Sequence, residues 1–170
     1  MADFPQRKRI RLYGYDYSGR GYYFITICTK NRNEILSTIP AVGANCVRPI
    51  LTEIGRVVEK EIAVLSAVYA DVEIENFVIM PNHIHMILAI SPDGRTQFAP
   101  TVSRIIKQFK GSITKRISFP IWQTSFHDRI IRNENEYKNI YKYIDENSVL
   151  WQADIYNPQN SPKIKARDNL

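Results

Sequence analysis

The sequence has little cysteine and no long apolar run. Only two of its 170 residues are cysteines, Cys28 and Cys46, which are too few for a disulfide framework. The first five residues lack the apolar stretch of a secretory signal. The longest apolar run, residues 86–90, is far shorter than the roughly 20 residues needed to cross a bilayer. The sequence therefore predicts a soluble protein of the reducing cytoplasm that has no contact with membranes.

Internal repeats and low-complexity tracts are also absent, and acidic residues are outnumbered. Lys and Arg total 23 against 17 Asp and Glu, giving a formal net charge of +6. A basic chain favours a polyanionic partner, and nucleic acid comes before an acidic membrane surface. The length suits one domain, and 44% hydrophobic residues are enough for a core. We expect a single domain over residues 1–170, with a basic arm at 1–20 and a flexible tail at 157–170.

Hydrophobic periodicity predicts four strands and three helices. Strands are expected where β-formers gather or alternate, at residues 22–29, 72–80, 83–90 and, from a briefer pattern, 121–126. Helices are expected where apolar residues recur at three- and four-residue steps, at residues 52–69, 102–113 and 133–147. Residues 37–45 carry breakers and no period, which indicates a surface loop.

The order of these elements predicts the fold class. Pro81 and Asn82 interrupt two apolar runs and predict an antiparallel hairpin. Asn133, followed three residues later by Glu136, has the pattern of a helix N-cap. The order β-α-β-β-α-β is typical of an α+β, ferredoxin-like split βαβ antiparallel sheet layered with helices, here with an added C-terminal helix. That fold alone assigns no activity.

Two histidines stand two residues apart in the second hairpin strand. His83 and His85 therefore project from one face of the sheet, while Ile84 and Met86 project from the other. Imidazoles at such positions can hold a divalent cation, but a working site needs at least a third protein ligand. Taken alone, the pair is weak evidence for a metal site, because histidines more often serve simply as polar residues on a half-exposed strand.

The last helix carries a tyrosine and an amide one turn apart. Tyr143 and Asn147 lie one above the other at the border of the apolar stripe, whereas Tyr137 and Tyr141 better fit ordinary packing. An asparagine oxygen can complete a metal's ligands, and the phenol would then lie beside a phosphate bound to that metal. A phenol has a pKa near 10, so a cation would ease its deprotonation. Attack by the phenol on the phosphate would give a covalent phosphotyrosine. A free 3′-hydroxyl on DNA can later attack this linkage and reseal the strand.

Four stretches together resemble the HUH (His-hydrophobe-His) single-tyrosine transposases, and among them the REP-associated tyrosine transposases and their insertion-sequence relatives. The stretches are residues 21–29, 78–85, 121–123 with 128–133, and 143–147. The resemblance implies that His83 and His85 bind Mg²⁺ or Mn²⁺ and that Tyr143 forms a 5′-phosphotyrosine on single-stranded DNA bearing hairpins. It also implies that Asn147 contributes to the metal site. Many relatives follow that Asn with Pro, whereas this chain has Ser148, a departure that removes no catalytic group.

Other residues are candidates for holding the DNA. Basic residues on or after the second helix, with the arm residues 7–9, form a candidate phosphate-binding surface: Arg104, Lys107, Lys110, Lys115 and Arg116. A solvated helix face explains any one of them equally well. Aromatic candidates for base stacking are Tyr13, Tyr15 and Trp122, although the last better fits the core. His127 and Asp128 are kept outside the site, because surface positions explain them more simply.

Three functions stay open at this point. The first is a metal-dependent DNA endonuclease and strand transferase acting through Tyr143. The second is a non-catalytic nucleic-acid binding module on the same kind of sheet. The third is a phosphodiesterase in which water attacks and Tyr143 only shapes the pocket. The sequence also leaves open the DNA target, the identity of the metal, and whether a homodimer forms in which Tyr143 serves its partner's histidines.

Overall fold

The computed structural model describes residues 20–40, 48–91 and 101–160, and their main sheet has four strands and is layered with helices. The strands are β1 (Gly21–Cys28), β4 (Val72–Ile79), β5 (His83–Ile90) and β6 (His127–Ile131), in the order β4-β5-β1-β6. Each neighbouring pair is antiparallel. The helices are α1 (Glu53–Val68), α2 (Val102–Ile117) and α3 (Glu134–Glu146). The predicted α+β ferredoxin-like fold with an added helix is confirmed.

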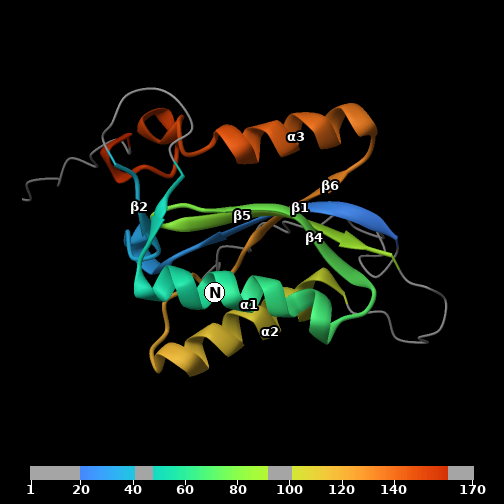
Figure 1. Ribbon diagram of the computed structural model, residues 1–170, viewed down its shortest axis with the longest axis horizontal. Helices are drawn as coiled ribbons and strands as arrows, with labels where there is room; N and C mark the ends of the chain where they lie inside the picture. Colours follow the sequence, from blue (N-terminus) through green and yellow to red (C-terminus); the bar gives the residue numbers. More distant parts are fainter. Residues whose placement is uncertain (1–19, 41–47, 92–100, 161–170) are drawn as a thin grey trace, which may run out of the picture.

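The helices lie on opposite faces of the sheet. Helices α1 and α2 cover one face, and α3 lies over the other (Figure 1). Alternate strand residues follow this division, so Ile84, Met86 and Leu88 of β5 enter the large core with α1 and α2. Ile87 instead packs with Ile144 of α3. The sequence predicted that the histidines and Ile84 and Met86 project from opposite faces. Of these faces, one carries the large core with α1 and α2, and the other lies under α3.

Short polar side chains begin all three helices. Thr52, Thr101 and Asn133 accept hydrogen bonds from backbone N–H groups three residues on, at 3.0, 3.3 and 2.9 Å. Glu136 completes the start of α3, because its carboxylate accepts from the backbone N–H of Arg132 at 2.9 Å. The predicted cap is confirmed, with the glutamate reaching one residue further back than a capping box requires. The start of the helix that carries Tyr143 is thus fixed by local chemistry.

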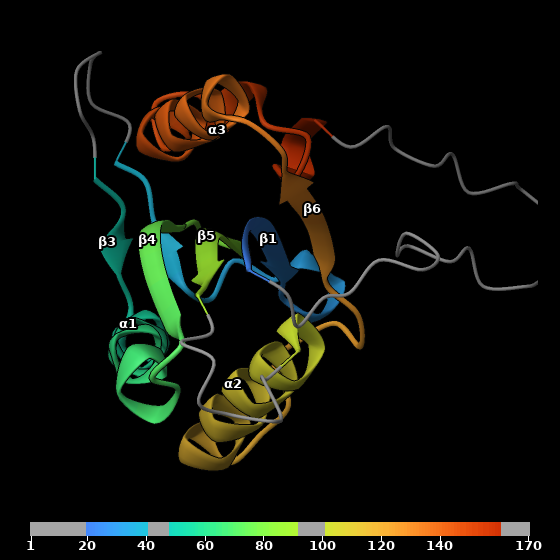
Figure 2. The same cartoon turned by 90° about the vertical axis from the view of Figure 1, so that its right-hand side faces the viewer.

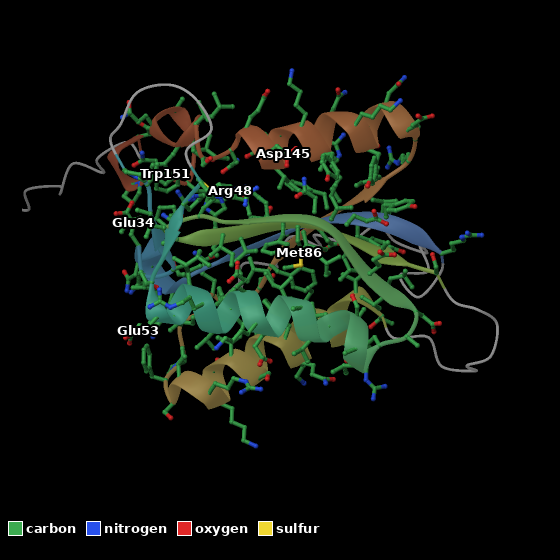
Figure 3. The ribbon with its side chains drawn as sticks, in the orientation of Figure 1. Glu34, Arg48, Glu53, Met86, Asp145 and Trp151 are labelled. Atoms are coloured by element: carbon green, nitrogen blue, oxygen red, sulfur yellow. The ribbon has the colours of Figure 1, made fainter. Side chains whose placement is uncertain are left out.

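The sheet edge also helps to position α3. The Asn76 side-chain amide on β4 donates to the Asp145 carboxylate at 2.9 Å. The register of β4 against β5 shifts between Ile74 and Asn76, and such an irregularity redirects side chains. Figure 3 shows Asp145 and Trp151 on the α3 side of the sheet and Met86 on the opposite side. Both ends of α3 are therefore tied down above the strands.

The fourth strand is not where the sequence predicted it. Residues 121–126 hold Ile121 and Trp122 in the core and make only an isolated bridge from Trp122 to Thr29, whereas the strand itself is β6. The prediction followed apolar and aromatic content. β6 is an edge strand that begins with the three polar residues His127, Asp128 and Arg129, so its hydrophobic signal is weak.

The predicted loop and the two chain ends are only partly described. Short strands β2 (Ser37–Thr38) and β3 (Ile50–Leu51) pair at the base of the predicted loop. The expected tail begins too early, because Asn157 is buried and donates to the Trp151 carbonyl at 3.0 Å. The part of the chain that the structure describes also contains three 3-10 helices: η1 (Lys30–Arg32), η2 (Trp151–Ala153) and η3 (Pro158–Asn160). Residues 1–19 of the predicted basic arm and residues 161–170 lie outside the described residues. In the described ranges, no helix has the length and apolar character of a membrane span.

Candidate active site

The two histidines of β5 lie buried on the α3 face, and each ring is held through Nδ1. Asn82 Oδ1 lies 2.8 Å from Nδ1 of His83, and Thr26 Oγ1 on β1 lies 2.8 Å from Nδ1 of His85. The Asn82 amide nitrogen donates to the carbonyls of Arg32 and Tyr156, which fixes the orientation of that amide. Its oxygen can therefore only accept, so the proton of His83 sits on Nδ1. An oxygen partner on one imidazole nitrogen is the arrangement that prepares the other nitrogen for a metal.

The Nε2 atom of His83 is buried and has no hydrogen-bond partner among the described residues. Nε2 is left as a bare lone pair once Nδ1 carries the proton, and leaving such an acceptor unpaired in the interior costs free energy. The two imidazole rings lie 4.5 Å apart between centroids. A bare, inward nitrogen beside a second imidazole suits a cation ligand better than a packing role.

Tyr143 of α3 comes directly onto this pair. Its hydroxyl lies 3.3 Å from Nε2 of His85, and the ring is half-buried. The anchor for this placement is Ile144, the next residue, which is 1% exposed and packs on Ile87 and Ile131 of the sheet. The structure thus brings together three of the residues singled out from the sequence.

Asn147 closes the site from the end of α3. It is the C-cap residue, it is fully buried, and neither atom of its side-chain amide makes a hydrogen bond of normal geometry. The amide does act on the Tyr143 hydroxyl and the Asp154 carboxyl, but a buried amide without one well-formed hydrogen bond is rare and needs an explanation. The sequence predicted a metal-ligand role for Asn147, and that role stays a prediction.

Asp154 is a candidate ligand that the sequence reasoning missed. The ligand atoms of His83, His85 and Asp154 all lie within 4.8 Å of one another. Asp154 is buried, and one carboxylate oxygen accepts from the backbone N–H of Tyr156 at 2.6 Å. Two imidazoles and one carboxylate are a donor set that divalent cations accept. Asp154 follows η2 in an irregular segment, so no periodicity could have marked it.

Burial controls the protonation of all these groups. Desolvation lowers the pKa of His85 to about 3, and the pKa of His83 falls well below its usual value through burial and the charges of His85 and Arg32. Both imidazoles are therefore neutral at pH 7, as metal ligation requires. Burial and the nearby Asp154 carboxylate raise the pKa of the Tyr143 phenol, and the Asn147 amide partly offsets this rise. The phenol consequently needs a positive charge beside it before it can ionise.

The predicted phosphate-binding residues lie on the other side of the sheet. Arg104, Lys107, Lys110, Lys115 and Arg116 are all on α2, which covers the face opposite Tyr143 (Figure 1). The Lys110 ammonium donates to the carbonyls of Gln123, Thr124 and Ser125 at 2.6, 3.1 and 3.3 Å. Arg116 pairs with the buried Glu61. Lys110 and Arg116 thus have structural partners, and a DNA-binding role for the five stays a prediction.

Two further candidates are also placed. Trp122 is 8% exposed and packs against Phe109, as its core alternative predicted, while Tyr13 and Tyr15 lie outside the described residues. His127 pairs across the strands with Thr26 but is exposed and does not join the group formed by His83, His85 and Asp154.

Fold and site together define the class: a ferredoxin-like protein whose sheet offers a His-hydrophobe-His pair to a tyrosine on an added helix. No family model matches the chain. An uncharacterized protein of Haemophilus influenzae is 32% identical over 90% of this chain and 94% of its own length, so the chain belongs to one family with it.

The resemblance of this chain to the REP-associated tyrosine transposases is confirmed. The REP-associated tyrosine transposase of Escherichia coli K12 is 34% identical over 77 residues, which are 45% of this chain and 44% of that protein. The solved structure of a REP-associated tyrosine transposase bound to a REP hairpin superposes with a TM-score of 0.59 at 23% identity, over 88% of this chain and 73% of that one. The sequence likeness covers less than half of the Escherichia coli protein, while the fold likeness covers most of this chain.

Proposed function

We propose that the chain is a metal-dependent endonuclease and strand transferase for single-stranded, hairpin-bearing DNA, with Tyr143 as its nucleophile. The observation that carries the proposal is the 3.3 Å approach of the Tyr143 hydroxyl to Nε2 of His85, beside the bare Nε2 of His83. The choice of a hairpin-bearing substrate is supported by the transposase of the same fold, which was solved with a REP hairpin.

The residues present fit a divalent cation. His83, His85 and Asp154 would hold it. Burial raises the pKa of the Asp154 carboxyl, and its contacts with the Tyr156 backbone and the Asn147 amide partly offset this rise. When bound, Mg²⁺ or Mn²⁺ would draw charge from the scissile phosphate and lower the pKa of a nearby phenol. The Nδ1 contacts to Asn82 and Thr26 keep both imidazoles oriented for this task.

Cleavage and rejoining of the strand need no nucleotide cofactor, because each bond to phosphorus that breaks is replaced by another. The Tyr143 phenolate oxygen forms a bond to phosphorus as the bond from phosphorus to the 3′ oxygen breaks. The phenol proton is released and the leaving 3′ oxygen takes up a proton, which leaves a 3′-hydroxyl and a 5′-phosphotyrosine. Attack by a 3′-hydroxyl on that linkage reverses the exchange and joins strands. The half-buried position of Tyr143 limits the access of water that would hydrolyse the intermediate.

The test is a denaturing gel with end-labelled hairpin-bearing single strands and Mn²⁺. We expect a covalent band with the wild-type chain and none with Tyr143→Phe, while DNA binding changes little. Tyr141→Phe is the matched control, because Tyr141 lies on the same helix and is 38% exposed, and it should retain the band.

The same gel separates the two alternative functions. An adduct that survives Tyr143→Phe would refute the assigned nucleophile. Cleaved strands with free ends and no adduct would favour attack by water, and binding without any cleavage would favour a binding module. Omitting the metal should abolish the band. Both histidines are uncharged and are weak bases, so without a cation nothing beside the phenol favours its ionisation.

A further inference from the structure

The face that carries the histidines is only half covered by a helix. α3 packs mainly on β4 and β5, and Ile144 also reaches Ile131 of β6, so the rest of the face formed by β1 and β6 lies beside the helix (Figure 2). The strand pairing places Tyr22 opposite Ile131 and Phe24 opposite Arg129, and these four residues are called the β1-β6 face. Phe24 belongs to the cluster under α3, so this face adjoins the candidate active site.

Phe24 connects the two regions. Its ring stacks on the His85 ring, with 5.1 Å between centroids and 28° between planes. It also meets the Tyr143 ring edge-on at 6.0 Å. Phe24 is only partly buried, although it sits in the middle of the sheet on a central strand. An aromatic surface is therefore present immediately beside the candidate nucleophile.

Tyr22 continues this aromatic surface one step away from the site. It is 43% exposed, and its ring contacts Tyr137 of α3 edge-on at 5.2 Å. A cleft of about 360 Å³ opens at this point, lined by Tyr22, Ile131, Arg132, Asn133, Glu134 and Tyr137. The cleft thus offers a flat ring together with charged and amide side chains, which are the groups that contact a nucleobase face and edge.

Spacing and charge both suit an extended strand of DNA. Positions two apart on a strand are separated by roughly 6.7 Å, and Phe24 and Tyr22 are related in this way, leading from Tyr143 outward. Arg129 and Arg132 are exposed beside the two rings, and the Arg129 guanidinium also pairs with the Glu136 carboxylate. Aromatic rings in a row with guanidinium groups alongside are the typical floor of a single-strand binding groove.

We propose that Phe24 and Tyr22 stack against unpaired bases next to the scissile phosphate, with the base at Tyr22 seated in the cleft. The inference rests on the proposed function, because it places the substrate beside Tyr143. In this proposal Tyr22 and Phe24, and not the buried Trp122, stack on bases. The base contacts then lie on the α3 face, whereas the basic helix α2 lies on the opposite face.

The test measures equilibrium binding by fluorescence anisotropy at fixed salt, in EDTA, so that no cleavage is needed. The probes are a 20-nucleotide oligothymidylate and an abasic deoxyribose-phosphate strand of the same length and charge. Wild type should prefer the strand with bases. Tyr22→Ala should weaken binding to that strand about tenfold, since one stacked base is worth about 1–3 kcal/mol, and should change binding to the abasic strand less than twofold.

Two variants and a control make the result specific. Tyr22→Trp should restore the preference for bases, and Phe24→Leu should reduce it while keeping an apolar side chain against Tyr143. Phe119→Ala removes an aromatic ring that is 49% exposed just after α2, and it should leave the preference unchanged.

Equal losses of Tyr22→Ala on both strands, no loss on either, or a wild type indifferent to bases would overturn the proposal. The covalent-band assay is independent of these results. If the protein forms the covalent band but shows no preference for bases, the stacking proposal is refuted and the nuclease proposal stands. If it prefers bases but forms no covalent band, the nuclease proposal is refuted and the stacking surface stands.

Discussion

The oxygen donors of the candidate metal site come from two positions in the C-terminal part of the chain. Asn147 ends α3, and Asp154 follows one short 3-10 helix later. Both side chains are buried, but only Asp154 carries a charge. A carboxylate adds more to the binding of a hard cation than an amide does, because the charge of the ligands sets much of the affinity. Asp154 should therefore matter more for metal binding than Asn147.

We predict that Asp154→Asn raises the dissociation constant for Mn²⁺ at least tenfold, or about 1.4 kcal/mol. The substitution keeps the shape and the oxygen that accepts from Tyr156, so it removes little besides the charge. Isothermal titration calorimetry of the purified chain measures the effect. Asp145→Asn is the control, because Asp145 pairs with Asn76 away from the histidines. Unchanged affinity in Asp154→Asn would exclude Asp154 as a ligand.

The difference between Asp154 and the other site residues shows what residue spacing can predict. His83 and His85 are marked by a two-residue step in a strand, and Tyr143 and Asn147 by a four-residue step in a helix. In a regular strand or helix, such spacing places both side chains on the same face. Asp154 lies in a segment without a period, and only the fold brings it to the histidines.

At the scale of elements, the placement of α3 decides whether the site exists. The helix is fixed by the Asn133 cap, by Ile144 against the sheet and by the contact between Asn76 and Asp145. The sequence predicted the cap and the apolar stripe, and hence the helix. It did not predict β6, because a polar edge strand resembles a loop in its composition.

A pair of glycines tests the packing of the helices on the opposite face. A Cβ atom added at Gly55 of α1 would lie 2.0 Å from the Leu36 carbonyl oxygen, whereas one at Gly111 of α2 would meet nothing within 4 Å. Gly55→Ala should destabilise the chain by about 1–3 kcal/mol through this clash. Gly111→Ala should stabilise it by about 0.5–1 kcal/mol, because alanine is the better helix former.

Chemical denaturation of both variants beside wild type measures these changes. Because both substitutions add one methyl group inside a helix, helix propensity alone predicts the same sign for the two. A stabilising Gly55→Ala would show that α1 does not approach the backbone at Leu36 as described.

At the scale of the whole molecule, the sheet separates stability from chemistry. The large core lies with α1 and α2, and the candidate site lies with α3 on the other face. Two uncharged histidines are nevertheless buried on the site face, and this should link its chemistry to the stability of the fold. The ferredoxin-like order of elements was readable from periodicity, but the position of α2 behind the sheet followed only from the assembled layers.

We predict that the metal-free chain loses stability as the pH falls below about 6.5. The unfolded chain takes up protons on these histidines near that pH, whereas in the folded chain His85 does so only at about 3. The free energy of unfolding should drop by about 1.4 kcal/mol per pH unit for each histidine in this window. Thermal melts in EDTA between pH 7 and pH 5 measure this, and replacing His83 and His85 with Gln should flatten the dependence. An equally steep loss in that double variant would contradict the explanation.

The most direct test of the central claim is mass spectrometry of the covalent product. Wild-type chain incubated with hairpin-bearing single-stranded DNA and Mn²⁺ is digested with nuclease and trypsin, and the peptide that retains a nucleotide is sequenced. We predict a 5′-linked nucleotide on Tyr143. A nucleotide on any other residue, or a cleaved substrate with no modified peptide, would contradict the account.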